Sequence, residues 1–424
     1  MLDIKFIREN AELINQTAQD KKINFEVSDL LDIDKKKNSL QEELDALRSK
    51  LNEGNKKIRT LSNEERPAHI VAMKEVSEKV KELDEKSKDL KSLFLVEMLK
   101  VPSPLHSTTP IGKTDEDNVV LSTWGEIPKF DFEPKSHMAL GDELDIIDVE
   151  RGVKLSGARS YFLKNEGTLL ELALMRYALD FLVKRGFTPM TVPQFVKQHA
   201  MMGTGYFPGG EDQTYKLGED DLYLIGTSEV PLASYHYDEV LNQKDFPIKL
   251  TAWSDCFRRE AGTYGKDTHG LYRIHQFQKV EQVYIMENDI EASLKAHQYL
   301  LDNAIDFIKS LGIPHQITDV CSGDIGQGQV KKYDINSWMP SRDAYCETHS
   351  CSMFYEFQAR RLKMRYKDKN GKMKFCHTLN NTLIASPRVL IPILELNQTK
   401  EGTIKIPEVL VPYMHGITEI KQKK

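Results

Sequence analysis

The chain has 424 residues, of which 40% are hydrophobic and 29% charged, with a formal net charge of −6. This composition is ordinary for a globular protein of two or three domains and argues against a disordered or fibrous chain. No apolar run approaches the roughly 18 residues of a membrane helix, and the mixed, charged N-terminus lacks an apolar signal core. We therefore expect a cytoplasmic protein without membrane contact.

Cysteine usage and charge narrow the class further. The five cysteines form no C-x-x-C pair, so the sequence supports neither a disulfide scaffold nor a zinc ribbon. We interpret them as buried free thiols: Cys256, Cys321, Cys346, Cys351 and Cys376. The acidic total counts mildly against a nucleic-acid binder, but binding depends on local basic surfaces rather than on the sum of charges.

Residues 26–100 carry the pattern of a helical hairpin. Apolar residues recur at heptad spacing in two series, Leu40, Leu44, Leu47, Leu51, Ile58 and then Met73, Val76, Val80, Leu83, Leu90, Phe94. Between the series, Ser62 and Glu65 fit a capping box, and Pro67 is tolerated in a first helical turn. The spacing predicts two antiparallel helices of about 30 residues each, joined near residues 59–66.

The pattern alone leaves the purpose of this arm open between a dimerisation or spacer coil and a probe for a distant partner. Its flanks carry charges of both signs, which is typical of a solvated face. Residues 101–110 contain three prolines among small polar residues and end the helical pattern. We therefore predict two domains, residues 1–102 and residues 103–424.

The second domain mixes β-like runs with helical stretches. Alternating or β-rich runs occur at residues 249–257 and 277–285, and helical patterns at 168–185, 290–311 and 388–397. Strands interrupted by helices without regular β-α-β alternation predict an α+β fold, with an antiparallel sheet flanked by helices.

Residues 256–277 are the most informative stretch for chemistry. Two β-like runs flank a glycine-rich loop, as in a long hairpin. Arg258 and Glu260 begin the loop and more cations follow, which suits a triphosphate because the guanidinium fork binds phosphate oxygens. Taken singly, Phe277 is more typical of a core residue, and Glu281 of a surface or cross-strand ion pair.

Together these residues resemble a known family. F-R-x-E, with a loop ending in H-Q-F-x-K-V-E, resembles motif 2 of the class II aminoacyl-tRNA synthetases, specifically the seryl type. Thr227-Ser-Glu229 resembles the family's T-x-E loop, Gly186–Pro193 its motif 1, and His377–Arg388 its motif 3. Phe357-Gln-Ala-Arg-Arg361 matches a further signature. The likeness extends along almost the whole chain, and the predicted hairpin occupies the place of the family's tRNA-binding arm.

The resemblance implies an ATP-dependent serine–tRNA ligase. Serine and ATP would form seryl-adenylate and pyrophosphate, and serine would then pass to the 3′ end of tRNA(Ser), with tRNA(Sec) as a second candidate acceptor. It also implies Mg²⁺ as a cofactor and a homodimer. Because the nucleophile is the substrate's carboxylate, the enzyme needs positioning and charge neutralisation rather than a Ser-His-Asp set.

The resemblance also implies roles for individual residues. Arg258 would contact the α-phosphate and the serine carboxylate, and Arg388 would cover adenine and the γ-phosphate, which makes these two the candidate catalytic residues. Glu260 would read the adenine amino group, and Phe277 would stack on the ring. The implied ATP-binding residues are Arg258, Arg259, Glu260, Ile274, Phe277, Glu347, Thr348, His349, Ser350 and Arg388. The implied serine-binding residues are Thr227, Ser228, Glu229, Arg258, Glu281, Asn380 and Thr382, and the implied magnesium ligands are Glu347 and Ser350.

Some positions depart from the family pattern. In motif 3, Asn381 and Leu383 stand where glycines are usual, and Thr382 stands for serine. His349 replaces a serine in the magnesium segment, and Asn336 replaces an expected glutamate. These changes put the size of the serine pocket and the role of His349 in question.

Other functions fit less of the sequence. A ligase for threonine would require zinc, and no suitable Cys/His cluster is present. A non-catalytic relative would be expected to lose Arg258 and Arg388, and a purely structural coiled coil leaves residues 111–424 unexplained. The ligase interpretation requires the two arginines to face one common cavity.

Overall fold

The structure is a computed structural model that describes residues 1–262 and 270–422. His269, which the sequence places in the glycine-rich loop, lies outside the described residues. The chain divides into two compact units, Met1–Pro102 and Ser103–Lys424, and each has a hydrophobic core of its own. The boundary falls in the proline-rich segment that follows the helical pattern.

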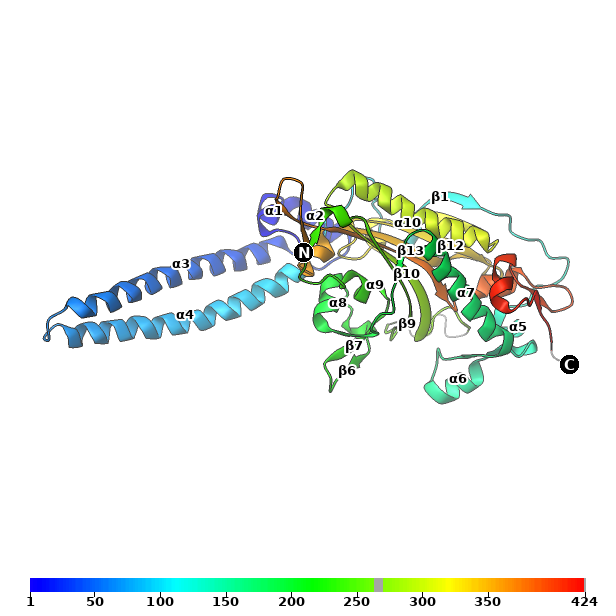
Figure 1. The fold of residues 1–424 in the computed structure, drawn as a ribbon, viewed down its shortest axis with the longest axis horizontal. Helices are drawn as coiled ribbons and strands as arrows, with labels where there is room; N and C mark the ends of the chain where they lie inside the picture. Colours follow the sequence, from blue (N-terminus) through cyan, green and yellow to red (C-terminus); the bar gives the residue numbers. More distant parts are fainter. Residues whose placement is uncertain (263–269, 423–424) are drawn as a thin grey trace. The chain divides into compact units, whose positions relative to one another are not determined.

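The first unit is built on two long helices. α3 (Val27–Lys57) and α4 (Arg66–Lys100) run side by side, as the blue ribbons of Figure 1 show. Their seam buries Leu44, Val80 and Leu83, three of the residues that the heptad pattern selected. The short helices α1 (Ile4–Glu9) and α2 (Ala11–Asp20) close a second cluster at the base of the pair. The predicted antiparallel hairpin is confirmed.

The turn between α3 and α4 uses half of the predicted capping box. Both the backbone N–H and the Oγ of Ser62 donate to Glu65 Oε2, at 3.1 and 2.7 Å, so the hydroxyl does not cap the helix itself. Near this end, a Cβ at Gly54 would lie 2.0 Å from Met73 Sδ. Glycine therefore gives the Met73 side chain room to lie against α3.

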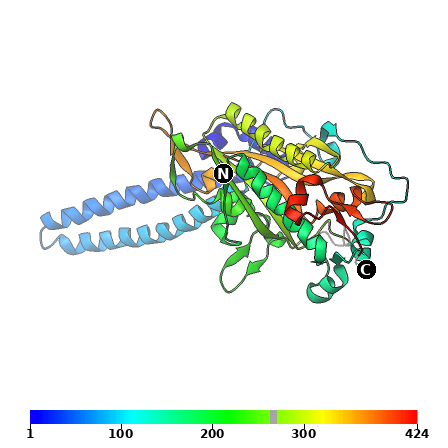
Figure 2. The ribbon, with the colours of Figure 1, turned by 45° about the vertical axis from the view of Figure 1, so that its right-hand side comes forward.

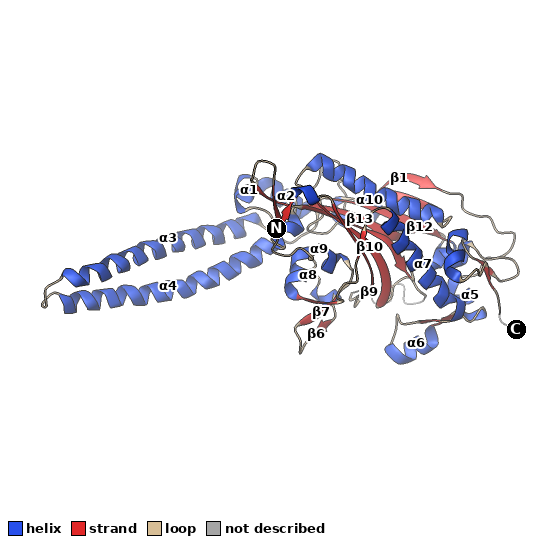
Figure 3. Cartoon of the chain, viewed as in Figure 1, coloured by secondary structure: helices blue, strands red, loops and turns tan. Residues whose placement is uncertain are grey.

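The second unit contains an eight-stranded sheet, drawn in red in Figure 3. Its strand order is β1-β11-β12-β13-β16-β10-β9-β4, and every neighbouring pair is antiparallel except β4 with β9. The strands are β1 (Val119–Trp124), β4 (Thr188–Pro189), β9 (Ile248–Phe257), β10 (Gln276–Met286), β11 (His315–Asp319), β12 (Lys331–Met339), β13 (Ala344–Tyr355) and β16 (His377–Ser386). The predicted α+β class with an antiparallel sheet is confirmed.

Two long helices cover one face of this sheet. α7 (Asn165–Lys184) packs on β9, β10 and β16, and α10 (Ile290–Ser310) packs on β13 and β16, as Figures 1 and 2 show. The central core of the unit lies between these helices and the strands. Because side chains alternate along a strand, every second residue of β10, β13 and β16 points to the other face.

Shorter elements surround the sheet. The remaining helices of the second unit are α5 (His137–Glu143), α6 (Val149–Ser156), α8 (Gln198–Thr204), α9 (Glu229–Ala233), α11 (Phe357–Arg361) and α12 (Leu390–Leu396). One three-stranded sheet joins β8 (Val240–Asn242), β14 (Arg365–Lys367) and β15 (Met373–Phe375), and another joins β5 (Phe195–Lys197), β6 (Lys216–Leu217) and β7 (Leu222–Leu224). Two two-stranded sheets pair β2 (Ile147–Asp148) with β3 (Phe162–Leu163) and β17 (Ile404–Lys405) with β18 (Glu419–Ile420).

Two compositional predictions can be compared with the structure. All five cysteines are buried free thiols, as predicted. In the part of the chain that the structure describes, no helix is long and apolar enough to cross a membrane.

The seam of the hairpin should respond to a single truncation. Leu44 is only 1% exposed between Val80 and Leu83, so Leu44→Ala should destabilise the arm by about 2–4 kcal/mol. We expect faster hydrogen exchange of the α3 and α4 amides in the full chain. Leu95→Ala, at a position on α4 that is 48% exposed, is the control. Equal exchange in the two variants would contradict this account of the seam.

Candidate functional site

One cavity opens on the face of the sheet that the two long helices leave free. Phe277, Lys279 and Glu281 of β10 line it, whereas Gln282 faces the helices and donates to the Leu300 carbonyl of α10. Residues of β13, β16, α9 and both ends of the glycine-rich loop also line it, together with Tyr206 and Gln329. The strand period of two thus separates cavity residues from core residues.

Arg258 and Arg388 both line this cavity, although they are 130 positions apart in the chain. Arg258 follows β9, donates from Nε to the Gly226 carbonyl at 3.3 Å, and lies with its guanidinium carbon 5.2 Å from the centre of the Phe277 ring. Two guanidinium groups in one cavity supply paired donor forks for phosphate or carboxylate oxygens.

Arg388 is held by the return limb of the glycine-rich loop. Its Nε donates to the Tyr272 carbonyl at 3.2 Å, its Nη1 donates to the Glu347 carbonyl at 3.1 Å, and its guanidinium lies 4.4 Å from the centre of the Tyr272 ring. These contacts fix the direction of the side chain before any ligand binds. Preorganised donors of this kind are what stabilisation of developing charge requires.

Glu347 supplies a negative charge beside the arginines. Burial by itself would raise the pKa of Glu347, but the positive charges of Lys332, Arg388 and Arg258 outweigh it and lower the pKa. The carboxylate is therefore ionised at neutral pH. Both arginines lower the pKa of Glu347, which is a second indication that their side chains converge.

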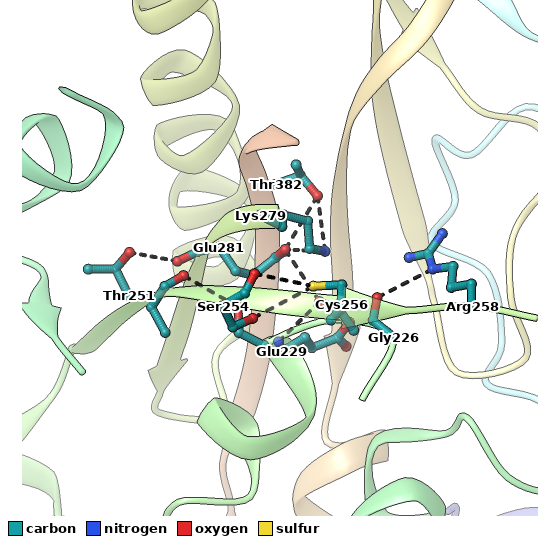
Figure 4. Close-up of polar contacts among 12 residues, drawn as sticks. Gly226, Glu229, Thr251, Ser254, Cys256, Arg258, Lys279, Glu281 and Thr382 are labelled. Carbon is teal, nitrogen blue, oxygen red and sulfur yellow. Dashed lines mark hydrogen bonds and ion pairs between the residues drawn. The ribbon is translucent and has the colours of Figure 1, made fainter. Parts of the chain in front are cut away.

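A second, acidic region of the cavity lies around β10, as Figure 4 shows. Glu281 forms an ion pair with Lys279, and the two side chains are 2% and 8% exposed. Thr227 Oγ1 and Thr382 Oγ1 each donate to Glu281 Oε2 at 3.4 Å. The result is a tight polar pocket in which a carboxylate accepts from hydroxyl groups.

Glu229, at the start of α9, is the other carboxylate of this pocket. Burial raises the pKa of Glu229 to about 7, and the nearby charge of Glu281 acts in the same direction. Lys279, Gln358 and Tyr206 oppose the rise through charge or hydrogen bonds. A bound cationic group would favour the ionised form of this carboxylate.

The fit to a magnesium ion rests on two oxygen ligands. Glu347 and Ser350 both line the cavity. Within residues 1–262 and 270–422, no three His, Cys, Asp or Glu side chains gather to hold a metal by themselves. A hard cation that takes its other ligands from phosphates and water needs no more than such a pair.

Four of the predicted site residues do not line the cavity. Arg259 donates its backbone N–H to Gln213, and Ser228 Oγ donates to the Ala252 carbonyl in the interior. Thr227 supports the two pocket carboxylates from behind the lining. Its Oγ1 accepts from the Glu229 N–H and donates to Glu281 Oε2. His349 is 1% exposed, and its Nδ1 pairs with Thr348 Oγ1, so its side chain lies in the core.

Two of the three motif 3 departures, Asn381 and Leu383, lie outside the cavity, whereas Thr382 lines it. Asn381 donates from Nδ2 to the Leu300 carbonyl of α10 at 2.7 Å, and Leu383 is fully buried in the core. Asn380 and Thr382, on the other side of β16, line the cavity. Asn336 donates to Thr318 Oγ1 at 2.8 Å and does not line it. The side chains that replace glycine therefore do not narrow the cavity.

The sequence did not identify several residues that line the cavity. Lys279 could have been found, because it stands between Phe277 and Glu281 on one face of a strand. Tyr206 follows no recognisable motif and reaches the cavity by its hydrogen bond to Glu229. Tyr272 lies inside the glycine-rich loop, where no local pattern marks it as the residue that holds Arg388.

An antiparallel sheet that carries two converging arginines on its open face defines the class of protein. Residues 214–397 match the family model "tRNA synthetase class II core domain (G, H, P, S and T)", and residues 1–104 match "Seryl-tRNA synthetase N-terminal domain". Both halves of the architecture thus have counterparts among the synthetases.

Similar proteins narrow this class to one family. A serine–tRNA ligase of Deinococcus radiodurans is 41% identical over 98% of both chains. A crystal structure of seryl-tRNA synthetase from Pyrococcus horikoshii complexed with ATP is 36% identical over 100% of both chains, with a TM-score of 0.91. One from Naegleria fowleri in complex with AMP is 30% identical, covers 100% of this chain and 99% of its own, and gives 0.86. The chain belongs to the seryl-tRNA synthetase family.

The buried ion pair of the pocket should be costly to break. Lys279→Met leaves the Glu281 carboxylate buried without its cation, so it should destabilise the second unit by about 3–5 kcal/mol. Thermal unfolding of the full chain measures the loss. Lys400→Met is the matched control, because its 3.2 Å pair with Asp131 is exposed and is worth about 0–1 kcal/mol. Similar melting temperatures for the two variants would show that Glu281 does not depend on Lys279.

Proposed function

We infer that the chain joins serine to tRNA in two steps. In the first, the carboxylate of L-serine attacks the α-phosphate of ATP, seryl-adenylate forms and pyrophosphate leaves. In the second, a ribose hydroxyl at the 3′ end of tRNA(Ser) attacks the seryl carbonyl carbon, and AMP leaves. The observation that carries this proposal is one cavity that combines Arg258 and Arg388 with the buried carboxylates Glu229 and Glu281, in a chain of this family.

The arginine side of the cavity suits the nucleotide. We assign the α-phosphate and the serine carboxylate to Arg258, and the γ-phosphate and one adenine face to Arg388. Phe277 would stack on the adenine, and Glu260, which accepts from Arg273 Nη1 at 2.9 Å, would read its amino group. Neutralising charge as pyrophosphate departs is the main contribution these residues can make to the rate.

The acidic side of the cavity suits serine. The ammonium group would pair with Glu229, and the hydroxyl would bond to Glu281 and Thr382, with Asn380 beside them. Alanine lacks the hydroxyl and would leave those buried groups unpaired, which is a strong basis for rejection. Threonine adds a single methyl group, so only the lack of room opposes it, and that filter is weaker.

Glu347 and Ser350 are the residues that would hold Mg²⁺. When bound, the ion would neutralise phosphate charge. The ionised state of Glu347, maintained by Lys332 and the two arginines, prepares the ligand without a proton to displace.

The remaining partners follow from the family. We propose that α3 and α4 bind tRNA, that motif 1 at Gly186–Pro193 contributes to a homodimer, and that tRNA(Sec) is a second candidate acceptor. We also place the reaction in the cytoplasm. β4, within motif 1, pairs with β9, the strand that leads to Arg258. An interface at this edge would therefore lie next to the strand that leads to Arg258.

Pyrophosphate exchange into ATP tests the first step. With each of the twenty amino acids supplied in turn, only serine should give rapid exchange. Arg388→Ala should lower the exchange rate at least about 100-fold, because a transition-state donor is lost. Arg342→Ala, which removes a guanidinium that lies 4.3 Å from the Tyr272 ring but does not line the cavity, is the control. No serine-dependent exchange by the folded chain would reject the function.

Shortening the hairpin tests the role of the arm. Lys91 Nζ donates to Gln41 Oε1 at 3.3 Å, so the two helices are side by side at these positions. Residues 42–90 can therefore be replaced by a short glycine linker that leaves the base of the hairpin in place. Exchange should persist, whereas aminoacylation of tRNA(Ser) should fall by about 100-fold or more. Wild-type tRNA binding should also weaken steeply with salt, because phosphate contacts release counterions. Full aminoacylation by the shortened chain would assign the arm another purpose.

A further inference from the structure

The segment Phe357–Arg361, which matched a family signature, forms the short helix α11 and has no place in the reaction described above. Its residues do not line the cavity. Its first three residues are nevertheless buried, and Gln358 is 2% exposed. The Gln358 amide therefore forms its hydrogen bonds with buried neighbours.

Gln358 connects the serine pocket to the sheet. Its Nε2 donates to Glu229 Oε1 at 2.8 Å and to the Thr204 carbonyl at 3.2 Å. Its Oε1 accepts from Thr378 Oγ1 at 2.7 Å, which fixes the orientation of the amide. Thr378 lies on β16, two and four residues before Asn380 and Thr382, and hence on the same face of the sheet.

The other oxygen of the Glu229 carboxylate is held by Tyr206, whose hydroxyl donates to Oε2 at 3.1 Å. Tyr206 lies in the loop after α8, and Arg361 fixes that loop. Arg361 Nη1 donates to the carbonyls of Met202 and Phe207 at 2.9 and 3.1 Å, so its contacts bracket Tyr206. Both carboxylate oxygens thus depend on α11, one directly and one through the loop.

Glu229 needs such support because burial and the charge of Glu281 both disfavour its ionised form. It is buried beside the carboxylate of Glu281, and Glu281 already has Lys279 as its partner. Without donors of its own, the Glu229 side chain would turn from the pocket or take up a proton. A carboxylate held at two points in one plane presents its remaining lone pairs in a single direction.

We propose that α11 is the positioning element for the ammonium-binding carboxylate. Gln358 donates to Glu229 directly, and Arg361 fixes the loop from which Tyr206 donates to the second carboxylate oxygen. This inference rests on the proposed binding of serine at Glu229. It gives the Phe357–Arg361 signature a role in selecting an α-amino acid, separate from the phosphate chemistry.

The positioning role has a pH signature. Serine's ammonium group needs Glu229 ionised, and burial raises the pKa of this group to about 7. Binding should therefore weaken as the pH falls through that value. The Gln358 donor favours the ionised form, so its loss should raise the pKa of Glu229 further and move the profile to higher pH. Glu281, Lys279 and Tyr206 are the titratable groups that face Glu229, and they remain in the variants of Gln358.

Pyrophosphate exchange with serine, measured from pH 6 to 9, tests the proposal. In Gln358→Met, kcat/KM for serine at pH 7 should fall roughly ten- to hundred-fold, as for a lost hydrogen bond to a charged group. The KM for ATP should stay within about two-fold, and the rise of kcat/KM with pH should move up by about one unit. Gln358→Glu retains the shape of the side chain. Its added carboxylate should raise the pKa of Glu229 and move the pH profile further in the same direction.

Gln282→Met is the matched control. Gln282 is also a buried amide, but it faces α10 and bonds to Leu300 and Asn303. Its variant should lose stability without any change in the pH profile for serine. Wild-type exchange with serine tests the function itself, so the two hypotheses fail separately. If folded Gln358→Met or Gln358→Glu keeps the wild-type kcat/KM and pH profile for serine, the positioning role is rejected.

Discussion

The structure depends on stabilising two carboxylate side chains inside one buried pocket. Glu229 and Glu281 lie in one pocket, nearly out of solvent, where an unpaired charge is expensive. Glu281 is balanced by Lys279, and Glu229 relies on neutral donors, Gln358 and Tyr206. A bound ammonium group would favour the ionised form of Glu229, and we propose this as the physical basis of selecting an amino acid.

The same cavity also contains positively charged side chains. Arg258 and Arg388 are anchored to backbone carbonyls, so their charges are available to a ligand while their directions are fixed. Glu347 is ionised because these cations and Lys332 outweigh its burial. Acidic and basic regions share one cavity because β10, β13 and β16 are neighbours in an antiparallel sheet. Ammonium, carboxylate and triphosphate can then be aligned on a single surface.

The competing functions weaken for separate reasons. Both arginines are present and face the cavity, which is not expected of a non-catalytic relative. The relatives that are about 40% identical over nearly the whole chain are serine–tRNA ligases, which favours serine over threonine as the amino acid. The second unit has a full sheet and a polar cavity, so the coiled-coil arm is only one part of the protein.

The sequence by itself determined the helical hairpin and the antiparallel α+β core, because heptads and strand alternation are local patterns, and its resemblance to the synthetase family indicated many of the cavity residues. It did not predict that Asn381 and His349 turn into the core, which depends on strand register and on a bulge between β12 and β13. Nor did the sequence reveal the hydrogen bond from Gln358 to Glu229, because the two residues are 129 positions apart. Only the tertiary structure decided these contacts, because they exist only after distant segments pack and buried charges find their partners.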